Sequence, residues 1–159
     1  MYLTSQLSTA YSSALESLLF FNSQQSRVSD QIVQAVEEFG SPKIVVEESW
    51  LRIHLSKFDK AQSIYVLCPS EAEPVLIGFF VYYRPSITEV SIIHLALNPE
   101  YMVAHGLSPE DTLLEIISQF RVQLKRIKGV DMLSFCYTPV CLRILRTHRD
   151  KSCRFSLLG

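Results

Sequence analysis

The chain has 159 residues, of which 48% are hydrophobic and 19% are charged, with a net charge of −1 at pH 7. This balance excludes a disordered chain and is typical of a folded globular protein, so we expect residues 1–159 to form one domain. The charge is unevenly placed: residues 1–118 carry 6 Lys/Arg against 14 Asp/Glu, whereas residues 119–159 carry 9 against 2. The basic C-terminal quarter is either a face that prefers anions or a solvated surface.

The sequence lacks the usual signals for membrane insertion and export. Its apolar runs are far shorter than the ~20 residues that span a bilayer, and no basic stretch precedes an apolar core at the N-terminus. The four cysteines include no Cys-x-x-Cys pair. We therefore expect a cytoplasmic protein with free thiols that does not associate with a membrane.

The first half of the chain predicts two helices followed by strands. Apolar residues at helical spacing predict a helix over residues 7–22 and a second from Ser29 to Phe39, ended by Gly40. Polar–apolar alternation or short apolar runs predict strands at 43–46, 50–55, 63–68, 75–83 and 89–97. Short polar turns join the last three, which favours an antiparallel meander. Gly78, inside the strand expected to be central, indicates a bulge or a close neighbour.

The second half predicts a strand–helix–strand passage. A helix is expected from Pro109 to about Lys128, with Ser108 as its N-cap and Gly129 as its stop. A strand over residues 130–137 follows, and the length of the passage is compatible with a parallel crossover. Residues 140–148 predict a short basic helix, and residues 154–158 a last strand.

The stretch from Ile92 to Ile117 runs from a buried strand through a loop into a helix. At such a helix N-terminus, unpaired backbone N–H groups and the helix dipole favour an anion. Glu110 and Asp111 nevertheless place two carboxylates where that anion would lie, and Asp111 also suits a capping box. The stretch combines the architecture of an anion site with an opposing charge.

The order of elements, and the sequence Leu95-Ala-Leu-Asn-Pro-Glu-Tyr101 at the end of the last meander strand, resemble the GNAT superfamily of N-acetyltransferases. The resemblance implies an α+β fold with helices flanking a central mixed, mostly antiparallel sheet. It also implies acetyl-CoA as the cofactor, with Leu95 and Leu97 facing its pantetheine arm.

The same resemblance implies that the loop from Met102 to Ser108 cradles the pyrophosphate of the cofactor. Compared with the family's glycine-rich motif this loop is degenerate, because it has one Gly and no Arg or Lys. Its expected cofactor contacts are Val103, His105, Gly106, Leu107 and Ser108.

Acyl transfer to an amine requires a general base, an oxyanion donor and a general acid. Glu89 is the candidate base, His94 titrates in the useful range, and Tyr137 is the candidate acid. Each also has a purely structural interpretation: a solvated carboxylate, a hydrogen-bonded core histidine and a packed aromatic ring, respectively.

Two other kinds of site have weaker support. The loosely spaced set Cys136, Cys141, His148 and Cys153 contains zinc-ligand types, but ordinary thiols are favoured and no metal is predicted. The basic run over residues 142–151 lacks interleaved aromatic residues, which argues against nucleic-acid binding.

We therefore expect an acyl-CoA-dependent N-acyltransferase-like protein that transfers an acetyl group to a small-molecule or peptide amine. The alternative is a non-catalytic module of the same fold that binds a protein partner or acts as a regulatory scaffold. The aromatic-rich strand Phe79–Tyr83 and the pair Phe20-Phe21 offer a surface for a homodimer.

Overall fold

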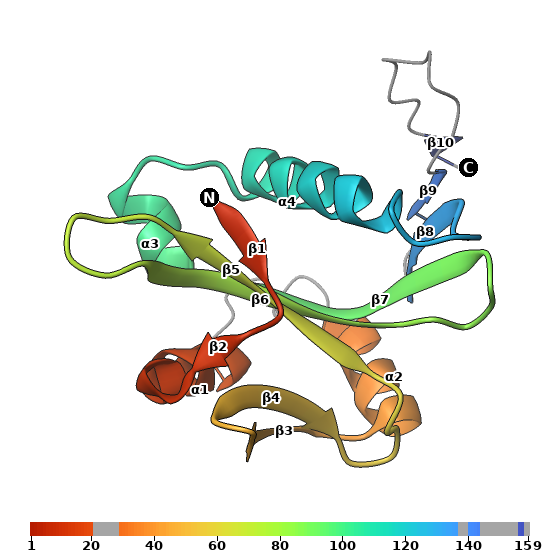
Figure 1. Ribbon diagram of the computed structural model, residues 1–159, viewed down its shortest axis with the longest axis horizontal. Coiled ribbons are helices and arrows are strands. Elements are labelled where there is room, and N and C mark those ends of the chain that lie inside the picture. Colours follow the sequence, from red (N-terminus) through yellow and green to blue (C-terminus); the bar gives the residue numbers. More distant parts are fainter. Residues whose placement is uncertain (21–28, 137–139, 144–155, 158–159) are drawn as a thin grey trace.

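The computed structural model describes residues 1–20, 29–136, 140–143 and 156–157 (Figure 1). Its helices are the 3-10 turn η1 (Thr9–Tyr11), α1 (Ser12–Phe20), α2 (Ser29–Phe39), α3 (Pro99–Ala104) and α4 (Pro109–Leu124). Its strands are β1 (Tyr2–Thr4), β2 (Leu7–Ser8), β3 (Pro42–Glu47), β4 (Trp50–Leu55), β5 (Gln62–Cys68), β6 (Val75–Tyr83), β7 (Glu89–Leu97), β8 (Met132–Phe135), β9 (Val140–Arg143) and β10 (Ser156–Leu157).

The fold is α+β and is built on two sheets. A seven-stranded sheet has the order β1-β5-β6-β7-β8-β9-β10, and a three-stranded sheet has the order β2-β4-β3. In the larger sheet β7 and β8 are parallel and all other neighbours are antiparallel. The expectation of a mixed, mostly antiparallel sheet flanked by helices is thus confirmed.

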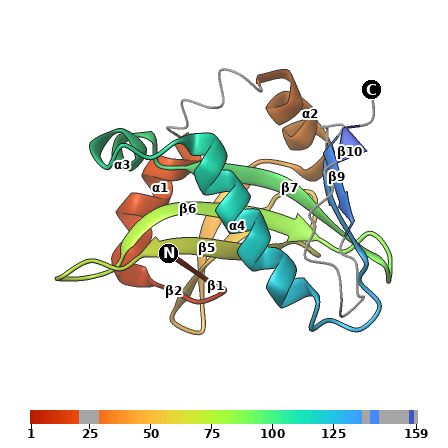
Figure 2. The ribbon, with the colours of Figure 1, turned by 90° about the horizontal axis from the view of Figure 1, so that it is seen from above.

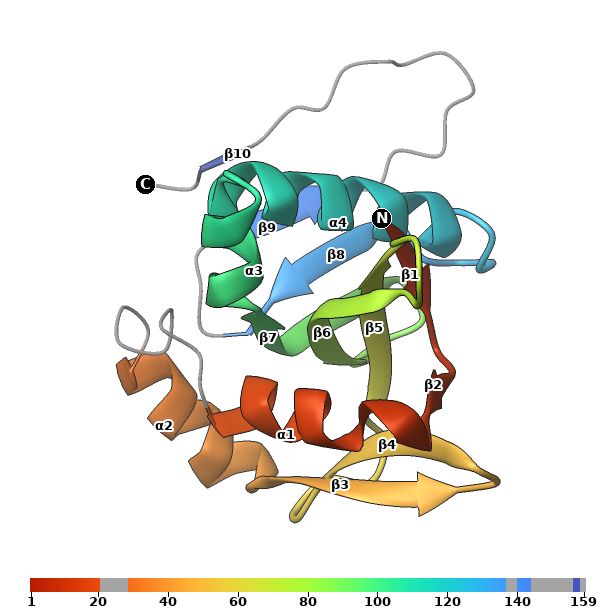
Figure 3. The ribbon, with the colours of Figure 1, turned by 90° about the vertical axis from the view of Figure 1, so that its left-hand side faces the viewer.

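The larger sheet separates two apolar cores. Helix α4 lies across one face, and α1, α2 and the smaller sheet lie on the other (Figures 2 and 3). Phe120 of α4 packs against Phe80 with ring centroids 4.7 Å apart, and both side chains are fully buried. On the opposite face Leu15 of α1 is buried with Phe79 and Leu51. Because successive strand residues point to opposite faces, Phe79 and Phe80 serve different cores.

The predicted meander β5-β6-β7 is confirmed, with β6 at its centre. Gly78 fits there because its neighbours leave no space: a Cβ would lie 2.7 Å from the Ala96 carbonyl oxygen. Next to it the β5–β6 register shifts between Val66 and Leu67, so Gly78 marks both a close neighbour and a bulge.

The predicted parallel crossover from β7 through α4 to β8 is also confirmed. Ser108 has extended backbone angles, and its side chain accepts a hydrogen bond from the Asp111 N–H at 3.3 Å, as an N-cap does. Gly129 has φ +99°, a conformation that favours glycine. The helix itself ends earlier than expected, at Leu124 with Lys125 as its C-cap, so Gly129 is not the helix stop but lies in the turn between α4 and β8.

The first residues of the chain lie at the edge of the larger sheet. Strand β1 pairs with β5, so that Leu3 is opposite Val66. The Gln119 side chain of α4 donates to the Met1 carbonyl oxygen at 3.3 Å. This segment is therefore held by groups that lie far along the chain.

Three expectations about the elements need correction. The first helix begins at Ser12 and not at residue 7, because Leu7 pairs with Leu51 in the smaller sheet. Residues 140–143, expected to start a basic helix, form β9 and pair with β8. Finally, Phe79 and Phe80 are fully buried and so offer no surface to a partner, whereas Tyr82 and Tyr83 of the same strand are half-buried; Phe21 lies outside the described residues. No helix of the described chain is long and apolar enough to cross a membrane.

Candidate functional site

Strands β7 and β8 part halfway along β7. They pair from Glu89 opposite Met132 to Ile92 opposite Phe135, and the Cys136 N–H donates to the Ile92 carbonyl at 2.8 Å. Strand β7 then continues to Leu97 with β6 as its only strand partner among the described residues. One edge of residues 93–97 therefore has no strand beside it in the described chain.

A bulge in β7 lies at this parting. Val81 is opposite His94 and Tyr82 is opposite Ile92, so Ile93 is an extra residue in β7. An extra residue reverses the alternation of side chains beyond it. As a result His94 lies on the same face as Glu89, the face covered by α1 and α2, whereas simple alternation would place the two on opposite faces.

Polar groups gather on that face where β7 and β8 still pair. Ser134 donates a hydrogen bond to Glu89, and the Ser91 hydroxyl lies 3.2 Å from the Cys136 thiol. Burial raises the pKa of Cys136, and the carboxylates of Glu38 and Glu89 add to this effect. The thiol is therefore held in its protonated form and acts as a hydrogen-bonding group, not as a nucleophile.

Tyr83 of β6 lies beside the same thiol. Burial raises the pKa of its phenol, and so do its contact with Cys136 and the nearby Glu38 and Glu89 carboxylates. A protonated phenol of this kind can donate a proton but cannot accept one at neutral pH. The polar cluster of Tyr83, Glu89, Ser91, Ser134 and Cys136 thus combines one carboxylate with neutral donors. Of these five residues, sequence analysis named Glu89 as a candidate base and Cys136 only in the weakly supported zinc set. It gave the other three no role in a site, because only strand pairing brings the cluster together.

The predicted catalytic residues are only partly brought together. Burial lowers the pKa of His94, so its imidazole is neutral near pH 7. The ring lies near that of Phe79, with centroids 5.9 Å apart. Along the strand His94 is roughly 15 Å from Glu89, at about 3.3 Å per residue, so the two do not share a proton. Tyr137 lies outside the described residues.

The expected phosphate loop differs from the prediction. Its first half belongs to helix α3, in which Asn98 is the N-cap, its side chain accepts from the Tyr101 N–H at 3.0 Å, and Pro99 takes the first position. An Asn N-cap followed by Pro is an ordinary signal for the start of a helix. The prediction of an open loop at Met102 is therefore wrong.

Most backbone donors of that segment are already used. The N–H groups of Met102, His105, Gly106 and Leu107 donate to the carbonyls of Asn98, Tyr101, Val103 and Met102, respectively. The Val103 side chain is 83% exposed and contributes no cover. An anion held here would have to compete with these hydrogen bonds.

Two side chains of the same segment also make contacts within the chain. The His105 ring stacks on Tyr101 at 3.9 Å, and its Nδ1 lies 3.0 Å from the Tyr101 carbonyl oxygen. The Ser108 hydroxyl donates to the Glu110 carboxylate at 3.0 Å. Gly106 has open space beside its backbone, since a Cβ added there would meet no atom within 4 Å.

The two residues predicted to face pantetheine lie at the parted strand. Leu95 is opposite Phe80 and Leu97 is opposite Gly78, and both join the core on the α4 side. Leu97 is 4% exposed, whereas Leu95 is half-buried. Leu95 is therefore the better placed of the two to touch a molecule inserted beside β7.

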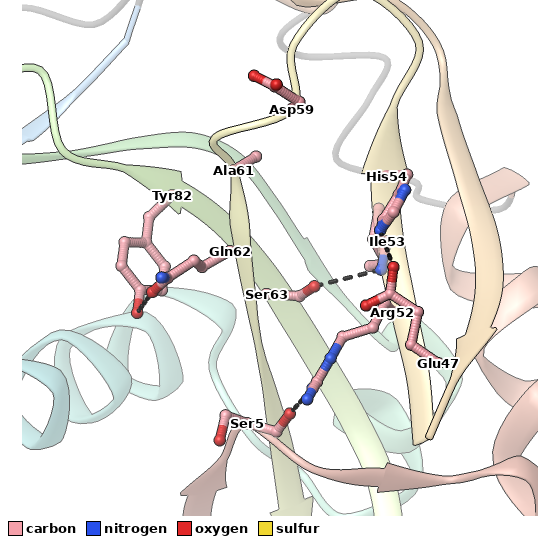
Figure 4. Close-up of a pocket in the computed structure, with 10 residues that line it drawn as sticks. All are labelled: Ser5, Glu47, Arg52, Ile53, His54, Asp59, Ala61, Gln62, Ser63 and Tyr82. Atoms are coloured by element: carbon pink, nitrogen blue, oxygen red, sulfur yellow. Dashed lines mark hydrogen bonds and ion pairs between the residues drawn. The ribbon is translucent and has the colours of Figure 1, made fainter. Parts of the chain in front are cut away.

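A separate cavity of about 500 Å³ lies between β4 and β5 (Figure 4). Its charged wall includes Glu47 and His54, whose side chains are 2.7 Å apart, and Arg52, which donates to the Ser5 carbonyl. Its other lining residues are Ile53, Asp59, Ala61, Gln62, Ser63 and Tyr82. Three of its charged or titratable side chains, those of Glu47, Arg52 and His54, thus already contact groups of the chain. Sequence analysis did not predict this cavity.

Metal binding receives no support from the described chain, which contains no group of three or more metal-ligating side chains. Cys136 is described, but the side chains of Cys141, His148 and Cys153 are not.

No family model matches the sequence, and no curated protein or solved structure is significantly similar to it.

Proposed function

We propose that this chain is a GNAT-like domain that holds the pantetheine arm of an acyl-CoA against the parted edge of β7 and transfers its acyl group to an amine. The observation that carries the proposal is the parting of β7 from β8 after Ile92, with a bulge at Ile93. No strand of the described chain pairs with the outer edge of residues 93–97, and in the proposal these backbone groups hold an extended ligand in the way that a sheet edge accepts a peptide.

The polar cluster next to the parting contains the general base and the general acid of the proposed reaction. In the proposed mechanism Glu89 takes a proton from the ammonium of the acceptor, directly or through water. Tyr83, whose phenol is protonated, donates a proton to the leaving thiolate. Sequence analysis gave this role to Tyr137. His94 contributes as a neutral hydrogen-bonding group.

The alternative, a non-catalytic module of this fold, is favoured by one specific observation. The N–H groups of residues 105–107, which follow helix α3, already donate to carbonyls of the chain, and Glu110 and Asp111 add negative charge at the start of the next helix. In this alternative the β7 edge accepts a segment of a partner protein, and no acyl-CoA is bound.

Calorimetric titration with acetyl-CoA, S-acetylpantetheine and adenosine 3′,5′-bisphosphate distinguishes the two. The proposed enzyme binds acetyl-CoA and S-acetylpantetheine, and either ligand slows amide exchange over residues 93–97 while leaving β3 and β4 unchanged. Binding of the bisphosphate alone would indicate a nucleotide site elsewhere. No heat at millimolar acetyl-CoA, together with unchanged exchange in β7, would refute the enzyme and leave the scaffold.

A further inference from the structure

The outer edge of β3 is unpaired in the described chain. Strand β3 ends the three-stranded sheet, with β4 as its only strand neighbour there. It lies at the margin of the molecule in two perpendicular views (Figures 1 and 3). Val46 of this strand is 62% exposed, although its partner Leu51 is buried. An open edge of this kind is a template for pairing with another chain.

The hydrogen bonds of the hairpin show which backbone groups face outward. The Ser56 N–H donates to the Ser41 carbonyl at 3.1 Å, so these opposing residues face each other through their backbone groups, and such positions alternate along an antiparallel ladder. Consistent with this, the Ile53 N–H donates to Ser63, on the side away from β3. Ile53 is opposite Ile44, so the backbone groups of Ile44 point away from β4, and by the same alternation so do those of Val46.

The side chains of the strand complement this backbone pattern. Lys43, Val45 and Glu47 share one face of β3, and Lys43 and Glu47 are exposed. If two copies of β3 pair antiparallel about Val45, Ile44 of each is opposite Val46 of the other, and all outward-facing groups of these residues find partners. The same register places each Lys43 opposite the other copy's Glu47. A parallel pairing would place like charges together.

We propose that β3 is a self-association edge, at which a second copy of this chain pairs antiparallel about Val45 and joins both small sheets into one. The ladder is short. Pro42 has no N–H to donate, and the chain leaves the strand conformation at Glu48, which has φ +50°. The interface between the two copies is therefore much smaller than that of a standard permanent complex. We expect a weak dimer whose population depends on protein concentration.

Charge reversal tests the register. Sedimentation of the full chain between 1 µM and 1 mM shows dimer formation, and Lys43→Glu or Glu47→Lys weakens it tenfold or more because each brings like charges together. The double variant Lys43→Glu/Glu47→Lys recovers wild-type association. An equimolar mixture of the two single variants also associates, because every cross-strand pair is then opposite in charge.

The mixture is the decisive experiment. Its Glu47→Lys chain still lacks the Glu47–His54 contact, so recovered association cannot come from restoring that contact and must come from the opposite charges across the interface. Amide exchange gives an independent readout: the Ile44 and Val46 amides become protected as concentration rises, while the Val45 amide is the internal control. A wild-type chain that stays monomeric at 1 mM overturns the proposal. So does a mixture that associates no better than either variant alone.

Discussion

Gly78→Ala tests whether the close approach of β6 to β7 sets the geometry of the parted strand. The new methyl group would lie 2.7 Å from the Ala96 carbonyl oxygen and 2.9 Å from the Leu97 side chain. Overpacking of this kind costs about 1–3 kcal/mol. Replacing Gly by Ala also reduces the freedom of the unfolded chain, which returns about 0.4–1 kcal/mol. The Ala96 oxygen belongs to the backbone and cannot easily move away, so the steric cost exceeds the entropic gain. We expect the free energy of unfolding to fall by about 1–2 kcal/mol.

Urea unfolding followed through the fluorescence of Trp50, the single tryptophan, measures this loss. Gly106→Ala is the matched control, since its methyl group meets nothing within 4 Å and its cost comes only from the φ of +59°. The two variants separate a steric effect from a backbone effect. Gly78→Ala should also weaken acetyl-CoA binding at β7, whereas a Gly78→Ala chain as stable as wild type would refute the packing argument.

Three further predictions concern charges near the candidate site. Replacing Glu110 and Asp111 by Gln and Asn should tighten acetyl-CoA binding about tenfold at low salt, because each carboxylate at this helix start weakens the binding of an anion by about 0.3–1 kcal/mol. Calorimetry measures the affinity, and an unchanged value would mean that the phosphates bind elsewhere. Cys136 should react with iodoacetamide at pH 8 at least about tenfold more slowly in the folded chain than in urea, as peptide mapping of the labelled thiols would show. The free energy of unfolding should fall as pH drops below about 6.5, because burial lowers the pKa of His94 and the unfolded chain therefore protonates it more readily than the folded one does; His94→Gln should flatten this dependence, as urea unfolding at a series of pH values would show.

Local patterns were sufficient for much of the fold. The alternation of Leu51, Ile53 and Leu55 with polar residues identified β4, and these three side chains are indeed buried. Helix α2 has the predicted bounds because its apolar spacing ends at Gly40, whose φ of +87° suits a helix stop. Both signals operate within a few residues, so no distant contact was needed to interpret them.

The errors arose where pairing with distant segments decided the outcome. Residues 140–143 form a strand because β8 offers them an edge, which the helical spacing of their apolar residues does not reveal. The bulge at Ile93 depends on the register with β6 and has no signature in the sequence. Helix α3 is a different case: Asn98 and Pro99 were visible signals, but the resemblance outweighed them.

The pairing of β1 with β5 has a consequence for the order of events during synthesis. Leu3 is opposite Val66, so the first strand leaves the ribosome long before its partner exists. At 5–20 residues per second the delay is on the order of several seconds, whereas a β-hairpin closes in about 1–10 µs. The β3–β4 hairpin can thus close before β5 has been synthesised. The pairing of β1 with β5, which completes one edge of the larger sheet, therefore follows the formation of this hairpin in each nascent chain.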